Sequence, residues 1–226
     1  MNDAAKKVVL INGSPKTSEV SVSETLAGIL EQQLNSAGIC VTNISIRKSI
    51  SKGSDKDFLS MMEADALVFL FPLYFFCLPS LLIRYLQDYQ EFLRRQDKNK
   101  EGQKIYAVVN CGFPESNINS EALRVIKSFS AHINTSYRFG ISLGGGGMFI
   151  GAAKAPFMKK TIESLNAAFA DIAGDIAETG PPKDDVYIEP KIPRALYFWG
   201  GNMGWKQASR NNGLKNKDLY RQPYKT

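Results

Sequence analysis

A loop rich in hydroxyl groups, between residues 13 and 23, has the residue types that bind phosphate. Gly13 allows the backbone to turn tightly, and Lys16 brings a positive charge. The hydroxyls gather where a helical pattern begins, near Ser23, and belong to Ser14, Thr17, Ser18, Ser21 and Ser23. A helix N-terminus has unpaired N–H groups and the positive end of the helix dipole, and both attract anions. The loop therefore predicts a phosphate cradle.

Two better-known phosphate motifs are missing from the sequence. It contains neither the G-x-x-x-x-G-K-[ST] pattern of P-loop proteins nor the G-x-G-x-x-G dinucleotide fingerprint. The plainer alternative is a polar turn with a serine N-cap, which is what most loops of serine and glycine are. The loop alone leaves both interpretations open.

Cysteine and histidine usage argues against several other kinds of site. The three cysteines, Cys40, Cys77 and Cys111, are far apart and form no C-x-x-C pair. The chain has a single histidine, His132. This spacing argues against a disulfide framework, a zinc site, an iron–sulfur cluster and a Ser-His-Asp arrangement.

Positive charge is concentrated at the end of the chain. The chain has 28 Lys/Arg and 22 Asp/Glu residues. Eight of the basic residues and one of the acidic residues lie from Lys191 onward, so residues 1–190 hold 20 basic and 21 acidic residues. The segment 191–226 thus carries a formal charge of +7 and the rest −1. No apolar run reaches the ~18 residues of a membrane span, and no signal peptide is apparent at the start. We expect a cytoplasmic protein without a membrane partner.

The elements that must position the loop alternate between strands and helices. Short apolar runs predict strands near residues 8–11, 39–46, 66–71, 105–111 and 137–143. Helical patterns start near residues 23, 55, 80, 120 and 155, and the last ends near residue 178. This alternation predicts an α/β protein with a parallel sheet between two layers of helices.

The strand patterns also predict an order. The first, third and fourth strands are apolar throughout and should be central, whereas the second and fifth are mixed and should lie at the edges. The order 2-1-3-4-5 satisfies both facts, and its switch point lies between the first and third strands. Ligands bind there, beyond the carboxyl ends of the strands, where the loops are 13–23, 72–79, 111–117 and 144–151.

At these loops the sequence resembles the NAD(P)H-dependent FMN reductases of the flavodoxin-like superfold. The resemblance rests on N-G-S-P-K at Asn12–Lys16 with S-V-S-E-T-L at Ser21–Leu26, on F-P-L-Y-F-F-C-L-P-S at Phe71–Ser80, and on N-C-G-F-P-E at Asn110–Glu115 with the glycines Gly144–Gly147. The motifs span about residues 8 to 150 in the right order. The resemblance implies a five-stranded flavodoxin-like three-layer sandwich that binds FMN and forms oligomers.

The resemblance also assigns site residues. The FMN phosphate is expected at Ser14, Lys16, Ser21, Val22 and Ser23, although Val22 stands where the family commonly has a hydroxyl. The flavin ring is expected between two loops, formed by Pro72, Leu73, Tyr74 and Phe75 and by Asn110, Cys111, Gly112 and Phe113. Aromatic faces suit stacking, and Gly112 permits close backbone approach. The alternative for the Tyr-Phe-Phe sequence is packing in the core.

We therefore expect an FMN-dependent oxidoreductase that takes hydride from NADPH or NADH and passes electrons to a small acceptor. Quinones, free flavins, nitro compounds and metal ions are all open as acceptors. One alternative is a flavodoxin-type electron carrier, although such carriers usually dock through acidic surfaces. The other is binding of nucleic acid or an anionic surface through the basic tail, whose aromatic residues lie among basic ones.

The tail is expected to be a separate extension. We predict a flavodoxin-like FMN-binding domain at residues 1–180 and a basic, aromatic extension at 181–226, because Pro181 and Pro182 cannot continue the preceding helix. The extension has no strong helical or strand period, but its aromatic residues can bury much apolar surface. We expect it to pack on the body or on a neighbouring subunit of a homodimer or homotetramer, and this expectation argues against nucleic acid as a partner.

Overall fold

The computed structural model describes residues 5–17, 20–96, 102–181, 183–222 and 224. The chain divides into two compact units, residues 1–190 and residues 191–226. Each unit is described by itself.

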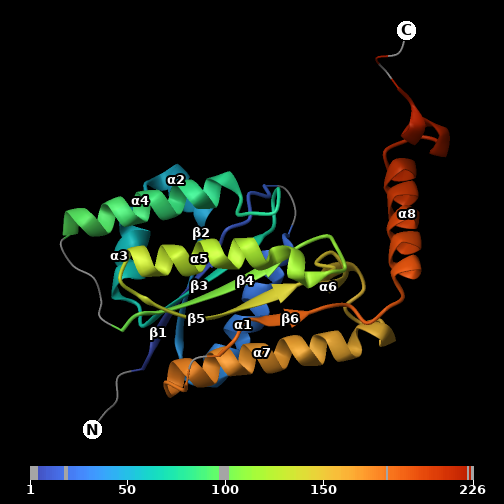
Figure 1. The fold of residues 1–226 in the computed structure, drawn as a ribbon. Helices are drawn as coiled ribbons and strands as arrows, with labels where there is room; N and C mark the ends of the chain where they lie inside the picture. Colours follow the sequence, from blue (N-terminus) through green and yellow to red (C-terminus); the bar gives the residue numbers. More distant parts are fainter. Residues whose placement is uncertain (1–4, 18–19, 97–101, 182, 223, 225–226) are drawn as a thin grey trace. The chain divides into compact units, whose positions relative to one another are not determined.

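The first unit is built on a parallel sheet (Figure 1). Its strands are β1 (Lys7–Asn12), β2 (Cys40–Ser45), β3 (Ala66–Pro72), β4 (Lys104–Asn110), β5 (Ser136–Leu143) and β6 (Val186–Ile188). They lie in the order β2-β1-β3-β4-β5-β6, and every neighbouring pair is parallel. The predicted flavodoxin-like α/β fold is confirmed, with one strand more than expected.

The sixth strand corrects two expectations. Residues 186–188 pair with Ile141–Leu143, so β5 is not at the edge, and this part of the expected extension belongs to the first unit. Three residues are too few to show a strand period, so pairing rather than pattern makes β6 a strand. Asp185 fixes its start, because its carboxylate accepts hydrogen bonds from the Gly140 N–H (2.6 Å) and the Tyr137 hydroxyl (2.8 Å).

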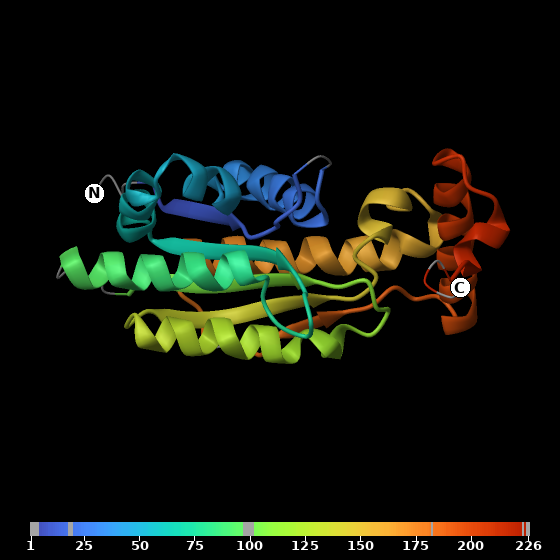
Figure 2. The ribbon, with the colours of Figure 1, turned by 90° about the horizontal axis from the view of Figure 1, so that it is seen from above.

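Helices cover both faces of the sheet, as Figures 1 and 2 show. The bounds are α1 (Val22–Ser36), α2 (Ile46–Lys52), α3 (Asp55–Glu63), α4 (Ser80–Gln96), α5 (Ser120–His132), α6 (Met148–Gly151) and α7 (Lys159–Ala177), with 3-10 turns η1 (Ser116–Asn119) and η2 (Pro156–Met158). On one face α1 and α7 pack on side chains such as Leu10 and Val68. On the other, α2 to α5 pack on side chains such as Ile11 and Phe69. Strands β1, β3 and β4 are apolar throughout because both of their faces are buried.

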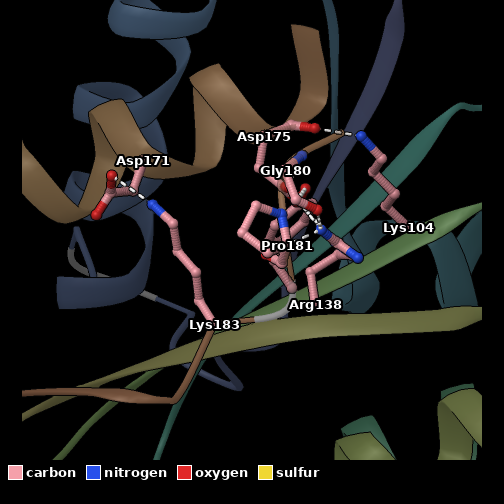
Figure 3. A network of polar contacts seen from close by, with 8 residues as sticks. Lys104, Arg138, Asp171, Asp175, Gly180, Pro181 and Lys183 are labelled. Atoms are coloured by element: carbon pink, nitrogen blue, oxygen red, sulfur yellow. Dashed lines mark hydrogen bonds and ion pairs between the residues drawn. The ribbon is translucent and has the colours of Figure 1, made fainter. Parts of the chain in front are cut away.

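A buried ion pair fastens the end of α7 to the sheet (Figure 3). Arg138 of β5 donates two hydrogen bonds of 2.8 Å to the Asp175 carboxylate of α7. The Tyr106 hydroxyl of β4 donates to the same carboxylate at 2.6 Å, and Lys104 donates to the Asp175 carbonyl. Burial alone would raise the pKa of Asp175, but the hydrogen bonds from Arg138, Tyr106 and the Gly180 N–H outweigh it and lower the pKa to about 2. This network lies where β4 and β5 begin, at the opposite end of the sheet from the candidate ligand loops.

The second unit contains a helix that the sequence did not predict. The elements of this unit are the helix α8 (Arg194–Asn211) and a 3-10 turn, η3 (Asn216–Tyr220). The apolar residues of α8 lie on several sides and are interrupted by Gly200, Gly201 and Gly204, so no single apolar stripe reveals the helical period.

Candidate functional site

One residue, Asn110, links three of the four expected ligand loops. Asn110, the last residue of β4, is buried, and its amide nitrogen donates to the Ser23 hydroxyl in the first turn of α1 at 3.1 Å. The same nitrogen donates to the Phe71 carbonyl near the end of β3, also at 3.1 Å. The backbone carbonyl of Asn110 accepts a hydrogen bond from the Leu73 N–H at 2.8 Å. The structure thus brings the start of α1 and the ends of β3 and β4 into direct contact.

The first loop ends in a capped helix. Ser21 is the N-cap of α1, and its hydroxyl accepts from the Glu24 N–H at 3.1 Å. The preceding N–H groups, at Val22 and Ser23, belong to the first turn, which has no intrahelical acceptors for them. Ser14 is buried and accepts weakly from the Lys16 N–H at 3.4 Å, while the Lys16 side chain is exposed. Ser18 lies outside the described residues.

Ser23 is a buried residue of the first turn of α1. Its side chain is only 1% exposed, and its hydroxyl is engaged by Asn110. This hydrogen bond links the first turn of α1 to the end of β4. Its N–H group remains at the helix N-terminus, where an anion can accept from it.

The second loop is an exposed aromatic hairpin. Tyr74 and Cys77 exchange two backbone hydrogen bonds of 2.9 Å, which leaves Phe75 and Phe76 at the tip. Both phenylalanines have positive φ, 48° and 59°. Positive φ at both central residues is typical of a type I′ turn, a position that usually holds Asn and Gly. The hairpin therefore carries backbone strain and presents its rings outward, since Phe75 is 98% exposed.

The alternative that this loop is core is therefore wrong for its tip. Pro72 and Leu73 are half-buried beneath it, and Tyr74 is exposed. Phe76, which the sequence did not single out, stacks on Phe113 of the third loop, with ring centroids 6.3 Å apart and planes 18° apart. The only signal for Phe76 was its place beside Phe75 in the same aromatic run.

The third loop divides into a buried and an exposed half. The Cys111 side chain is buried, its thiol donates to the carbonyl of Phe113 at 3.5 Å, and burial raises its pKa. Gly112 and Phe113 are exposed, and a Cβ built on Gly112 would meet nothing within 4 Å. Close approach of two loops occurs instead at Gly144, where a Cβ would lie 2.1 Å from the Pro114 carbonyl oxygen.

The described residues hold neither a cluster of candidate metal ligands nor a helix that could span a membrane. They contain no group of three or more His, Cys, Asp or Glu side chains placed to hold a metal ion. None of the helices in these ranges is both long and apolar enough to cross a bilayer.

Comparison with protein families agrees with the geometry. A family described as having the flavodoxin-like fold matches residues 6–125, more than half of the chain. The chain belongs to this family. The match covers the first loop, the aromatic hairpin and the exposed half of the third loop, so the flavodoxin-like part contains the whole candidate site. No curated protein sequence matches the chain.

Solved structures share the flavodoxin-like fold at low sequence identity. General stress protein 14 from Treponema denticola, solved in complex with FMN, has a TM-score of 0.55 at 18% identity and covers 76% of this chain and 99% of its own. An NADPH-quinone reductase from P. pentosaceus has a TM-score of 0.55 at 15% identity, and the match covers 74% of this chain and 97% of the reductase. A Streptococcus pneumonia TIGR4 flavodoxin has a TM-score of 0.52 at 15% identity, and the match covers 77% of this chain and 99% of the flavodoxin. At these identities the likeness shows the fold.

Proposed function

We propose that the protein is an FMN-dependent oxidoreductase that takes hydride from NADPH or NADH and passes electrons to a small acceptor. The observation that carries this proposal is the set of hydrogen bonds made by Asn110 to Ser23, Phe71 and Leu73, which we call the Asn110 clasp. It joins a helix N-terminus suited to a phosphate to a hairpin and loop suited to a planar ring. FMN has both parts, a terminal phosphate and a flat ring system.

The residues present fit FMN. The phosphate is placed at the start of α1, where Ser14, Lys16 and the first N–H groups of the helix supply donors and positive charge. The hairpin N–H groups of Phe75 and Phe76 take no part in the pairing of Tyr74 with Cys77, so they remain for the polar edge of the ring. The open side of Gly112 leaves space for a flat group. When bound, FMN supplies the ring that accepts and releases hydride.

The relatives support this assignment. One structural neighbour is described in complex with FMN and another as an NADPH-quinone reductase. Among the small acceptors considered, the exposed rings of Phe75, Phe76 and Phe113 favour planar aromatic compounds over metal ions, because stacking requires a π-face.

The visible spectrum of the purified protein tests the proposal. We expect a flavin spectrum that bleaches when NADPH or NADH is added without oxygen, and we expect FMN to bind more tightly than FAD, because the cradle fits a terminal phosphate. Equal affinity for both flavins would contradict the phosphate site. Absence of flavin binding would overturn the whole proposal.

Continuous oxidation of NADPH or NADH distinguishes the proposed enzyme from a flavodoxin-type electron carrier. An enzyme of the proposed kind oxidises NADPH or NADH continuously when a quinone is supplied. A carrier holds FMN but consumes nicotinamide only when a separate reductase is added.

A further inference from the structure

Glu189, the residue directly after β6, caps a 3-10 turn that lies 73 positions earlier in the chain. Its carboxylate oxygen Oε1 accepts from the Ser116 N–H at 2.8 Å and from the Ser116 hydroxyl at 3.1 Å. Ser116 is the first residue of η1, and the N-cap residue of that turn, Glu115, gives it no side-chain cap. Glu189 therefore supplies from another strand the cap that the local sequence lacks.

The capped residue, Ser116, is buried on all sides. It is only 1% exposed, so water does not replace a lost acceptor. Its carbonyl accepts from the Ser142 hydroxyl of β5 at 2.6 Å, and that hydroxyl accepts from the Asn119 side-chain amide at 2.9 Å. Without Glu189 the Ser116 N–H would be a buried donor that has lost its acceptor, which is costly unless the segment moves. The place of Ser116 thus depends on Glu189.

The residues on either side of Glu189 hold the neighbouring glycine loop. The Gly144 N–H donates to the Ile188 carbonyl at 2.9 Å, and a Cβ built on Gly145 would lie 2.9 Å from the Pro190 side chain. The Gly145 N–H in turn donates to the Phe113 carbonyl at 2.6 Å. The third loop is therefore fixed at two points, at the Phe113 carbonyl and at the capped turn that follows it.

Phe113 is the aromatic side chain that the third loop contributes to the candidate ring site. It stands three residues before Ser116, and its ring stacks on Phe76 of the hairpin. Offset stacking depends on the relative placement of two rings. A displacement of the capped turn therefore changes the surface that the two loops present to a flat ligand.

We propose that Glu189 is a positioning residue for the flavin ring, because its cap on η1 holds Phe113 in the place where the ring binds. The proposal rests on the proposed function, since the ring is that of FMN. Glu189 acts through the third loop and not by contact with the flavin. When a segment is in place in only a fraction of the molecules, the apparent affinity for its ligand falls by that fraction.

Two substitutions of Glu189 separate its hydrogen bonds from its charge. Glu189→Gln keeps an oxygen that can accept from Ser116, and the new amide nitrogen can be solvated because the residue is exposed. Glu189→Ala removes the acceptor. Glu163→Ala is the matched control, since it removes an exposed carboxylate from α7.

Amide hydrogen exchange of the full chain without flavin, resolved by NMR, tests the cap directly. We expect Glu189→Ala to speed exchange at the Ser116 amide at least about tenfold. The Gly144 amide, which reports the hydrogen bond to β6, should exchange as in the natural protein. Glu189→Gln and Glu163→Ala should change neither rate. Unchanged exchange at Ser116 in Glu189→Ala would overturn the proposal, and so would equal acceleration at Gly144, which would mean that β6 itself detaches.

Titration with FMN and with riboflavin tests the consequence for the ring. Glu189→Ala should weaken both flavins alike, by about tenfold, because the third loop holds the ring and not the phosphate. The emission of the bound flavin should also be less quenched, since contact with aromatic rings quenches it. Glu189→Gln should restore affinity and quenching.

Two results of the titration would contradict positioning through the cap. One is a loss confined to FMN, which would assign the effect to the phosphate side of the site. The other is a loss in Glu189→Gln as large as in Glu189→Ala, which would assign it to charge. A natural protein that binds no flavin would overturn the proposed function, and the exchange rates, which need no flavin, distinguish that failure from a failure of the cap.

Discussion

Phe75 and Phe76 hold a backbone conformation that bulky residues rarely adopt. Positive φ at each costs on the order of 1 kcal/mol or more. Burial returns little, since Phe75 is 98% exposed and Phe76, which stacks on Phe113, is still 61% exposed. Strain with so little packing is typical of functional positions. It indicates that the rings are kept for what binds at the hairpin tip.

Replacing this pair by the residues that the turn prefers should separate stability from function. We expect Phe75→Asn with Phe76→Gly to raise the free energy of unfolding by about 1–2 kcal/mol and to weaken FMN binding at least tenfold. Urea unfolding and flavin titration measure the two effects. Asn134→Gly is the control, because Asn134 also has positive φ, 53°, but lies beyond the end of α5. A stabilised double variant with unchanged flavin affinity would contradict a role for the rings.

Ser14 and Ser23 should respond differently to the same substitution. Ser14→Ala removes a hydroxyl proposed to contact phosphate, so it should weaken FMN by about 1.5–3 kcal/mol and leave riboflavin nearly unchanged. Ser23→Ala removes the acceptor of Asn110 and should weaken both flavins alike. Titration of each variant with both flavins makes the comparison. A loss confined to FMN in Ser23→Ala would return that hydroxyl to the phosphate site.

At the scale of elements, the Arg138–Asp175 pair should stabilise the contact between α7 and β5. Asp175→Asn leaves a guanidinium buried without its counter-charge, so the free energy of unfolding should fall by about 3 kcal/mol. Asp171→Asn is the control on the same helix, because the Lys183–Asp171 pair is 41% and 48% exposed and should contribute less than about 1 kcal/mol. Urea unfolding at neutral pH distinguishes them, and equal losses would contradict a special role for the buried pair.

The same pair gives stability a defined dependence on pH. The pKa of Asp175 is lowered from 3.8 to about 2, so its contribution is present above pH 4 and is lost as the pH falls toward 2. This change amounts to roughly 2 kcal/mol. The stability difference between the natural protein and Asp175→Asn should therefore shrink over that interval. A difference that stays constant from pH 4 to pH 2 would show that Asp175 does not titrate there.

Sequence predicts elements well where their pattern is set by the sheet itself. Strands β1, β3 and β4 are apolar throughout because helices cover both faces, and that signal is visible without a structure. By contrast, β6 is three residues long and is defined by its pairing with β5, and the helix α8 lacks an apolar stripe. A strand defined by its pairing and a helix without an apolar stripe leave little trace in local sequence.

The sequence predicts which loops form the candidate site, but it does not predict the contacts of individual side chains. Composition and strand order place the first loop, the hairpin and the third loop at one end of the sheet, and the structure confirms that they meet. The roles of Ser23 and Cys111 depend on which way each side chain turns after its element ends. The stacking of Phe76 on Phe113 depends on two loops that meet only in the folded chain.

At the scale of the whole molecule, the two compact units predict separable functions. Deleting residues from Lys191 onward should leave FMN affinity nearly intact, because the candidate site lies within residues 1–190. The deletion should weaken the expected homo-oligomer and raise the apparent KM for the nicotinamide, since a segment of +7 attracts its phosphates. Sedimentation and steady-state kinetics check both. Lys215→Gln with Lys217→Gln is the control, which should raise KM without changing the mass.

The clasp at Asn110 has a consequence for the order of folding events. Its amide reaches Ser23, 87 positions earlier, and Phe71, 39 positions earlier, so both hydrogen bonds form only after α1, β3 and β4 have come together. Because the entropy of closing such long loops is lost before the contacts can form, we expect them to form after the transition state. Asn110→Ala should therefore accelerate unfolding in stopped-flow measurements and leave the folding rate nearly unchanged. If folding slows by the full change in stability, the ligand end of the sheet is instead part of the folding nucleus.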